Sequence, residues 1–417
     1  MRDGKIALVS DEPIAETYCP RVVDAEGQWV MPGFLDTHTH YDAEVVVAPS
    51  LSESVRHGVT TVLLGSCSLS MICSEPEDCS DLFTRVESIP REQVLPILQQ
   101  HKTWRSPSQW VDFMKQHPLG PNVISFLGHS DLRASVLGLS RSVDRDCVPT
   151  EAELEQMGQV LEEALDCGFL GLSTMSLKWD KLDGNREWSK SLPSTYSRWK
   201  EVRFLNRILR KRGRIHQGAP NVMLPLTITR FLQQSIGWLR KPLKTTLITL
   251  IDLRGNRPFS HVSKLASHFT NLAGGDFRWQ VLPTPFAVYA DGIDLVVFEE
   301  FGSGEAALHL KDQLQRNRLM QDKQYRREFR RFYKQKYSPR VWQRDFADAY
   351  ILDCPDSTLV GRNFDDIAKE RSIHVVDLFL DLVVEFGRSL RWYTIIGKDI
   401  DSRLGKDSGY GSFLPAH

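Results

Sequence analysis

Runs of apolar, largely β-branched residues alternate with longer helical stretches along much of this chain. The runs TTVLLG, NVISFLG, GFLGLST and LITLIDL are short and apolar enough to be buried strands. Between two of them lies TEAELEQMGQVLEEALDCG, in which Thr150 and Glu153 form a capping-box pattern and Gly168 is a typical helix stop. Strands that alternate with helices usually pair in parallel. The sequence therefore predicts an α/β fold with a parallel sheet.

Charge and hydropathy exclude several classes of partner. The chain has 52 basic and 53 acidic side chains, a net charge of -1, so it has no field of one sign to attract nucleic acid or an anionic membrane. No window approaches the roughly 20 apolar residues of a membrane helix, and the first residues lack the apolar core of a signal peptide. The seven cysteines are scattered rather than closely paired. We therefore expect a cytoplasmic protein that acts on a small molecule.

Two histidines separated by one residue follow an apolar run in the segment MPGFLDTHTHYD. Side chains at positions i and i+2 of a strand point the same way, so His38 and His40 can bind one metal ion together. Neutral imidazole is a favoured zinc ligand. Such pairs also occur on solvent-facing strands, so the pattern by itself leaves a metal site and an exposed strand both open.

The residues around this pair resemble the amidohydrolase superfamily. PGFLDTHTH is similar to the first-strand signature PGxxDxHxH, in which both histidines bind metal at the C-terminal mouth of the barrel. GSCSLS is similar to the G-x-C-x-x-S motif that supplies a cysteine ligand in the N-acyl-D-amino-acid deacylases, or D-aminoacylases. Without that context, a lone cysteine is usually a buried structural thiol. The resemblance implies a TIM (β/α)8 barrel of the metal-dependent hydrolase type, with His38, His40 and Cys67 as ligands.

The resemblance extends through most of the chain and implies further site residues. FLGHSDLRASVLG looks like the family's GHxxLRxxxxG stretch, which places His129 and Arg133 at the mouth of the barrel, with His129 toward the substrate. A purely structural role for His129 is the alternative. His216, in RGRIHQGAP, has a position comparable to the family's fifth-strand histidine ligand, and again a structural histidine is the alternative.

The sequence departs from the family pattern at the sixth and eighth strands. Where the family has His-x-Lys, LITLIDLRGN offers Asp252, which can bind a divalent metal, and Arg254, which can pair with a substrate carboxylate. His261 and His268 are alternatives to Asp252. The family's eighth-strand aspartate accepts the proton of water, and only the tripeptide DSG beginning at Asp407 is similar to it. Asp407 is therefore the predicted general base, and a plain turn is the alternative.

The same resemblance divides the chain into two domains. KIALVS and RVVDAEGQWVMPGF are short β-like runs with turn residues between them, which predict strands of a small, incomplete β-sandwich over residues 1–32. The barrel is predicted from residue 33 to residue 417. Because the eighth-strand motif matches poorly, we expect the barrel to be incomplete at its C-terminal end.

Together these features predict a hydrolase of linear, non-peptide carbon–nitrogen bonds that uses one or two zinc ions. Zinc lowers the pKa of bound water from 15.7 to about 7. The expected substrate is an N-acyl-D-amino acid whose carboxylate pairs with Arg254. Three alternatives stay open: a cyclic amide hydrolase, a non-catalytic binding protein on the same fold, and a poorly stable fragment with open sheet edges.

Overall fold

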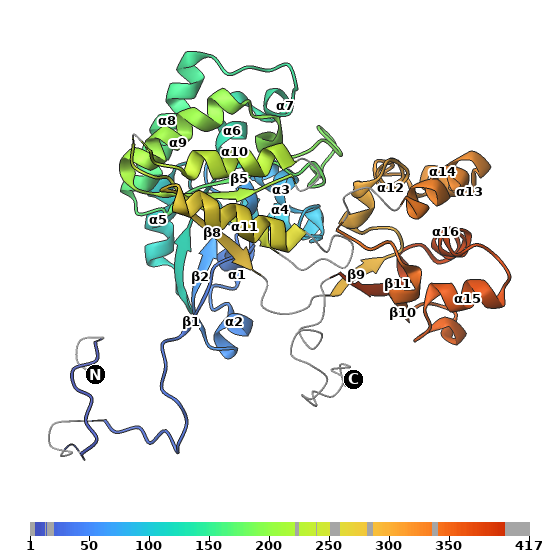
Figure 1. Ribbon diagram of the computed structural model, residues 1–417, viewed down its shortest axis with the longest axis horizontal. Coiled ribbons are helices and arrows are strands. Elements are labelled where there is room, and N and C mark those ends of the chain that lie inside the picture. Colours follow the sequence, from blue (N-terminus) through green and yellow to red (C-terminus); the bar gives the residue numbers. More distant parts are fainter. Residues whose placement is uncertain are drawn as a thin grey trace.

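The computed structural model describes residues 5–12, 14, 21–221, 225–238, 240–250, 259–281, 287–335 and 341–396. Figure 1 shows two bodies, a larger one in which helices surround strands and a smaller one formed by the later part of the chain. Within the described residues, no helix has the length and apolar character needed to cross a bilayer. The cytoplasmic location stays a prediction.

The larger body is built on parallel strands in sequence order. One sheet pairs three strands and the other pairs five, all in parallel. The strands are β1 (Phe34–Asp36), β2 (Val59–Leu64), β3 (Asn122–Ser125), β4 (Leu127–Gly128), β5 (Gly171–Met175), β6 (Ile215–Ala219), β7 (Lys244–Leu250) and β8 (Asp276–Val281). Only Phe126 separates β3 from β4, so these two segments fill one position and the eight strands fill seven. The parallel α/β architecture predicted from the alternating pattern is confirmed.

Helices cover this parallel body on the outside (Figure 1). They are α1 (Glu44–Val47), α2 (Ser52–Arg56), α3 (Pro76–Phe83), α4 (Arg91–His101), α5 (Pro107–Gln116), α6 (His129–Leu137), α7 (Leu139–Ser142), α8 (Glu151–Asp166), α9 (Trp199–Arg212), α10 (Pro225–Ser235) and α11 (Phe259–Leu272). The predicted capping box of α8 is present: Thr150 accepts from the Glu153 amide and the Glu153 side chain accepts from the Thr150 amide. Met157, Leu161 and Leu165 of this helix are buried in one core with residues of the strands.

In the part of the chain that the structure describes, no parallel strand fills an eighth barrel position. After β8 the chain forms an antiparallel sheet in the order β10-β11-β9, from β9 (Ala287–Asp291), β10 (Ala349–Asp353) and β11 (Arg391–Ile395). Its helices are α12 (Gly302–Leu308), α13 (Gln313–Gln321), α14 (Lys323–Lys334), α15 (Phe364–Glu370) and α16 (Val375–Phe386). Aromatic side chains, including Phe298, Phe346 and Trp392, form a separate core for this body. The sequence analysis did not anticipate an antiparallel unit within the predicted barrel domain.

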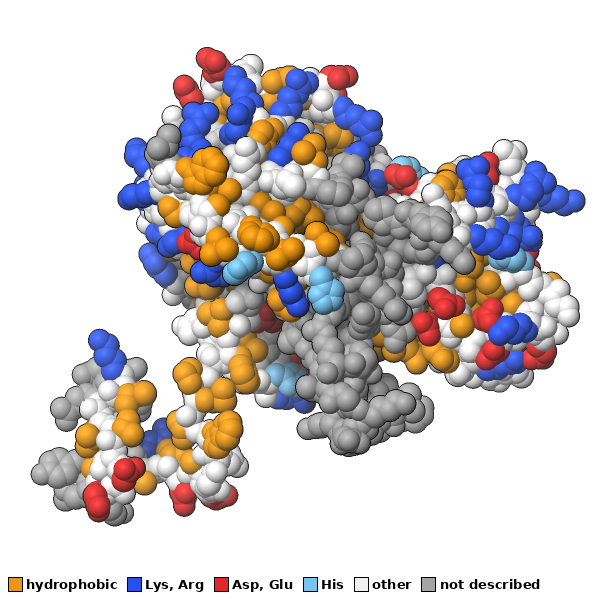
Figure 2. Space-filling view, in the orientation of Figure 1, with side chains coloured by type: hydrophobic (Ala, Val, Ile, Leu, Met, Phe, Trp, Pro, Cys, Tyr) orange, Lys and Arg blue, Asp and Glu red, His pale blue; other side chains and the backbone are white. Residues whose placement is uncertain are grey.

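The expected strands at the N-terminus are not confirmed. Residues 21–33 contain no strand, and Trp29 and Val30 are 92% and 90% exposed. Figure 2 shows apolar side chains along this extended segment. A β-branched run forms a strand only when another strand supplies hydrogen-bond partners and a packing surface. Residues 21–33 have neither in the described part of the chain.

The loop after β5 joins the two bodies through Trp188. Its indole Nε1 donates to the His309 carbonyl of α12 at 2.9 Å. The Arg85 guanidinium and the Lys311 ammonium lie over the indole ring, 4.4 and 5.0 Å from its centroid. Arg85 also forms a 3.1 Å ion pair with Glu299 of the smaller body. Trp188 is therefore held between a cation from each body.

Candidate metal centre

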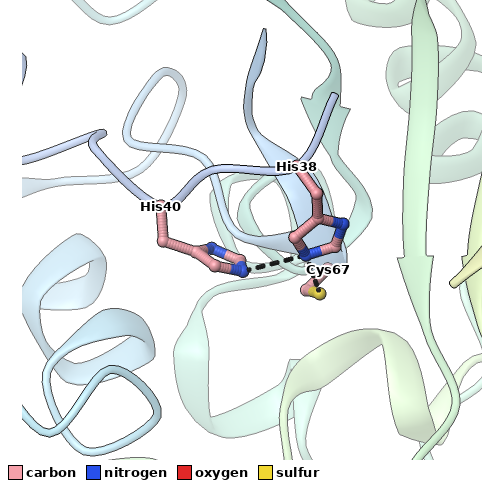
Figure 3. A group of neighbouring side chains, drawn as sticks. All are labelled: His38, His40 and Cys67. Atoms are coloured by element: carbon pink, nitrogen blue, oxygen red, sulfur yellow. Dashed lines mark hydrogen bonds between the residues drawn. The ribbon is translucent and has the colours of Figure 1, made fainter. Parts of the chain in front are cut away.

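Three potential metal ligands meet where the first two parallel strands end (Figure 3). His38 and His40 follow β1, and Cys67 lies in the short 3-10 turn Ser66–Ser68 that follows β2. Because β1 and β2 pair in parallel, their carboxyl ends lie at the same edge of the sheet. Ligands in barrel enzymes are expected at this edge. The structure thus brings together the three residues that the resemblance implied as ligands.

The three side chains point their donor atoms at one another. The Nε2 atoms of His38 and His40 are 3.3 Å apart, and the Cys67 sulfur lies 3.2 Å from His38 Nε2. All three donor atoms lie within 4.8 Å of one another. Two nitrogen ligands of a tetrahedral zinc ion, each about 2.0–2.1 Å from the metal, lie about 3.3–3.4 Å apart. The donor set and the spacing therefore fit zinc.

Burial favours the neutral forms of these side chains. Burial lowers the pKa of His38, and burial together with the nearby His38 lowers the pKa of His40 to about 3. Both imidazoles are then neutral at physiological pH, the form that binds metal. Burial raises the pKa of the Cys67 thiol, and the carboxylates of Asp180 and Glu87 raise it further. A cation at this point would offset both causes and favour the thiolate.

The Cys67 turn has a backbone conformation that non-glycine residues rarely adopt. Cys67 and Ser68 have φ values of +54° and +66°. Side chains of β5 and β6 hold this turn. The Cys67 amide donates to Oε1 of Gln217 on β6 at 3.1 Å, and the Ser68 amide donates to Oγ of Ser173 on β5 at 2.9 Å. Left-handed non-glycine residues concentrate at functional sites. Gln217 and Ser173, which the sequence analysis missed, fix the position of the thiol.

Carboxyl groups also face the centre. Glu87 Oε1 lies 3.5 Å from His40 Nδ1. Burial, followed by the charges of Asp180 and Asp42, raises the pKa of Glu87 to about 8, and burial raises those of Asp180 and Asp42 to about 7. Carboxyl groups with such shifts cluster at functional sites. Asp42 ends the segment MPGFLDTHTHYD, although the sequence analysis assigned it no role there, and Glu87 and Asp180 lie outside the motifs named in the sequence analysis. Asp180 follows a buried strand, which is the signal that could have indicated it.

His216 lies on the opposite side of its strand from the metal centre. Its Nε2 bonds to Thr174 Oγ1 at 3.0 Å, and its ring packs on Phe231 of α10, 5.2 Å between centroids. The next residue, Gln217, reaches Cys67 instead. Successive side chains of a strand point to opposite faces, so one strand position separates the two environments. This placement corrects the expectation that His216 shares a metal with His38 and His40.

His129 is fully buried in a polar network instead of lining the mouth. Its Nε2 lies 2.8 Å from Glu201 Oε1, and its Nδ1 lies 3.4 Å from Thr174 Oγ1. Glu201 also pairs with the buried guanidinium of Arg133. Because these side chains satisfy one another away from solvent, the geometry favours the structural alternative for His129 over contact with a substrate.

The remaining predicted site residues fall into two groups. Asp252, Arg254 and Asp407 lie outside the described residues. The alternatives to Asp252, His261 and His268, are exposed on helix α11. The roles of Asp252, Arg254 and Asp407 therefore stay predictions.

Comparison with known proteins finds relatives in sequence and in fold. No family model matches the chain. Uncharacterised proteins of Mycobacterium tuberculosis and Mycobacterium bovis are each 51% identical over 411 residues, 97% of this chain and 67% of theirs. An N-acyl-D-aspartate deacylase of Alcaligenes xylosoxydans xylosoxydans is 33% identical over 177 residues, 42% of this chain and 32% of that protein. A D-aminoacylase of the same organism is 28% identical over 177 residues, again 42% of this chain and 32% of its own length.

Solved structures share the architecture at low sequence identity. The N-acyl-D-glutamate deacylase of Bordetella bronchiseptica, in complex with zinc and a phosphonate inhibitor, superposes with a TM-score of 0.53 at 18% identity, over 88% of this chain and 60% of that chain. A crystal structure of D-aminoacylase gives 0.51 at 16% identity, over 89% and 62%. The chain thus spans about three fifths of the length of these enzymes.

The parallel strands have the fold of these TIM-barrel deacylase structures. By sequence, the chain belongs to one family with the mycobacterial proteins, and it is a divergent relative of the N-acyl-D-amino-acid deacylases, similar to them over 42% of its length. Those characterised relatives are hydrolases that act on carbon–nitrogen bonds other than peptide bonds.

Proposed function

We propose that this protein hydrolyses N-acyl-D-amino acids with the help of a divalent metal ion held by His38, His40 and Cys67. The observation that carries the proposal is the convergence of the three donor atoms, two of them 3.2 and 3.3 Å from His38 Nε2. The names of the relatives supply the substrate class, because they deacylate N-acyl-D-aspartate and N-acyl-D-glutamate.

The side chains of the protein have separate roles in metal binding, substrate binding and proton transfer. When bound, zinc supplies Lewis acidity, which polarises a carbonyl and lets water ionise near neutral pH. The neutral imidazoles and the Cys67 sulfur hold the ion, and the Gln217 contact keeps the sulfur in place. Arg254 pairs with the substrate carboxylate, Asp252 is a further ligand, and Asp407 accepts the proton. These last three roles extend the proposal from the sequence.

Metal content tests the centre directly. The purified full-length chain should contain about one or two equivalents of zinc by elemental analysis, and His38→Ala and Cys67→Ala should each remove most of it. Cys354→Ala is the matched control, because Cys354 is also a buried thiol but belongs to the core of the smaller body. A folded wild-type chain that holds no metal after incubation with zinc would contradict the proposed centre.

Substrate specificity is tested separately from metal binding. The zinc-loaded chain is incubated with N-acetyl-D-aspartate, N-acetyl-D-glutamate, their L enantiomers and a hydantoin, and the release of amine or acid is measured. We expect deacylation of a D substrate and its loss in Cys67→Ala. Hydrolysis of the hydantoin alone would favour the cyclic amide alternative. A zinc-loaded chain that cleaves none of them would favour the non-catalytic alternative.

A further inference from the structure

The second nitrogen of His38 is held by a residue from the far end of the parallel body. Gln280 lies on β8 and is 242 positions away in sequence, yet its Oε1 atom is 3.0 Å from His38 Nδ1. Its amide nitrogen lies 3.5 Å from the carbonyl oxygen of Thr37, the residue before His38. Backbone hydrogen bonds do not join β8 to β1 among the described strands, so this side chain links the two strand ends.

The chemistry of these contacts determines which nitrogen of His38 carries the proton. The Thr37 carbonyl can only accept a hydrogen bond, so the amide nitrogen of Gln280 faces Thr37 and its oxygen faces His38. A carbonyl oxygen also can only accept, and therefore His38 Nδ1 carries the ring proton in the neutral imidazole. The lone pair is then on Nε2, the atom that points to His40 and Cys67.

His40 has a similar arrangement with a different partner. Its Nε2 faces His38, and its Nδ1 is 3.5 Å from a carboxyl oxygen of Glu87, a contact that does not have the geometry of a hydrogen bond. Both imidazoles thus turn Nε2 toward a common point and Nδ1 toward an oxygen atom. Oxygen acceptors of this kind orient metal-binding histidines and raise their basicity.

We propose that Gln280 is a positioning residue that fixes the orientation and the tautomer of His38 for metal binding. This inference rests on the proposed metal centre and assigns a role in it to the strand that lies seventh in the barrel order. Gln280 contacts His38 Nδ1 and not the Nε2 atom that faces His40 and Cys67, so it acts through His38.

Cobalt binding to full-length variants tests the role. Co²⁺ reports on the centre through the charge-transfer absorption of a cobalt thiolate, and titration gives the dissociation constant. We expect Gln280→Leu, which has no acceptor, to weaken Co²⁺ binding about 10- to 100-fold. Gln280→Glu keeps the oxygen facing His38 while losing the donor to Thr37, so its affinity should equal or exceed that of the wild type. Arg278→Leu, on the same strand but exposed, is the control and should bind as the wild type does.

The outcomes distinguish two roles for Gln280: orienting His38, and only linking the ends of β8 and β1. Melting temperatures of the metal-free proteins show how much each change affects folding alone. Equal weakening in Gln280→Leu and Gln280→Glu would overturn the inference, because only the contact with Thr37 is lost in both. Unchanged affinity in Gln280→Leu would also overturn it. If the wild-type chain did not bind cobalt, both the proposed metal centre and this inference would be wrong. If the wild type binds cobalt and His38→Ala does not, the metal centre stands, and the comparison of the Gln280 variants decides the inference.

Discussion

Two groups of histidines lie on opposite sides of strand β6, and they differ in what their ring nitrogens meet. Near Gln217, the Nε2 atoms of His38 and His40 point at each other and at a thiol. Near His216, on the other side, the rings hydrogen-bond through Thr174 in a chain that ends at a buried ion pair. The first group gathers neutral donors around one point, and among the described residues no Arg or Lys side chain bonds to them. The second already contains its own cation.

The difference shows why residue type alone does not separate ligands from structural histidines. Arg133 supplies a positive charge to the buried network and Glu201 supplies a negative one, so the two charges offset each other. Within the described part of the chain, no guanidinium or ammonium group bonds to His38, His40 or Cys67, whereas the carboxyl groups of Glu87 and Asp180 lie near them. A divalent ion would therefore be stabilised at one cluster and excluded from the other.

The largest expected effect on stability comes from breaking the ion pair between Glu201 and Arg133. Glu201→Gln leaves the Arg133 charge uncompensated in the interior, and breaking a buried ion pair in this way costs about 3–5 kcal/mol. Urea denaturation should show this loss in the free energy of unfolding. At low temperature, where the variant stays folded, its zinc content should match that of the wild type. A variant that loses zinc but keeps its stability would reverse the roles assigned to the two groups.

Adjacent residues of β6 give a sharper test of the same comparison. His216→Asn removes the Thr174 hydrogen bond and the contact with Phe231, which should cost about 1–3 kcal/mol of stability while leaving zinc affinity within about threefold of wild type. Gln217→Leu removes the acceptor that holds the Cys67 amide, so it should weaken zinc binding by about tenfold. Zinc affinity is measured by competition with a chromophoric chelator. If His216→Asn weakened zinc binding more than Gln217→Leu did, the roles assigned to the two faces of β6 would be wrong.

The smallest expected effect is a gradual change in the stability difference between the wild type and Glu201→Gln as the pH falls. Hydrogen bonding and charge from His129, with the charge of Arg133, outweigh the effect of burial and lower the pKa of Glu201 below its usual 4.5. A lowered carboxyl pKa contributes stability that is present above the unfolded value and is lost as the pH falls through the folded value. The stability gap between wild type and Glu201→Gln should therefore be constant from pH 7 to about 5 and narrow below pH 4.5. A gap that widens on acidification would contradict the assigned charge state.

The sequence predicts the parallel architecture well because alternating apolar runs and amphipathic helices are local signals. The helix that follows Thr150 has both its capping box and its buried face where the pattern indicates. The juxtaposition of His38, His40 and Cys67 also follows from local motifs at the ends of adjacent strands. In contrast, the face on which His216 lies depends on strand register, and a change of one position exchanges the two faces.

Contacts between distant parts of the chain were beyond prediction. Gln280 and Gln217 are ordinary polar residues in their own segments, and only the folded barrel brings them to His38 and Cys67. The antiparallel body was missed for a related reason, because its short strands come from segments more than fifty residues apart, interrupted by helices. Neither case leaves a periodic signal in the sequence.

Trp188 has a practical consequence for anyone who dissects this protein into modules. The ring is contacted by Arg85 from one body and Lys311 from the other, and its indole proton is bonded to the His309 carbonyl. Excising residues 287–396 to obtain a minimal barrel would leave an unprotected tryptophan on a loop that also carries Asp180. Graft and deletion designs should therefore cut elsewhere, or replace Trp188 with a polar side chain in the same step.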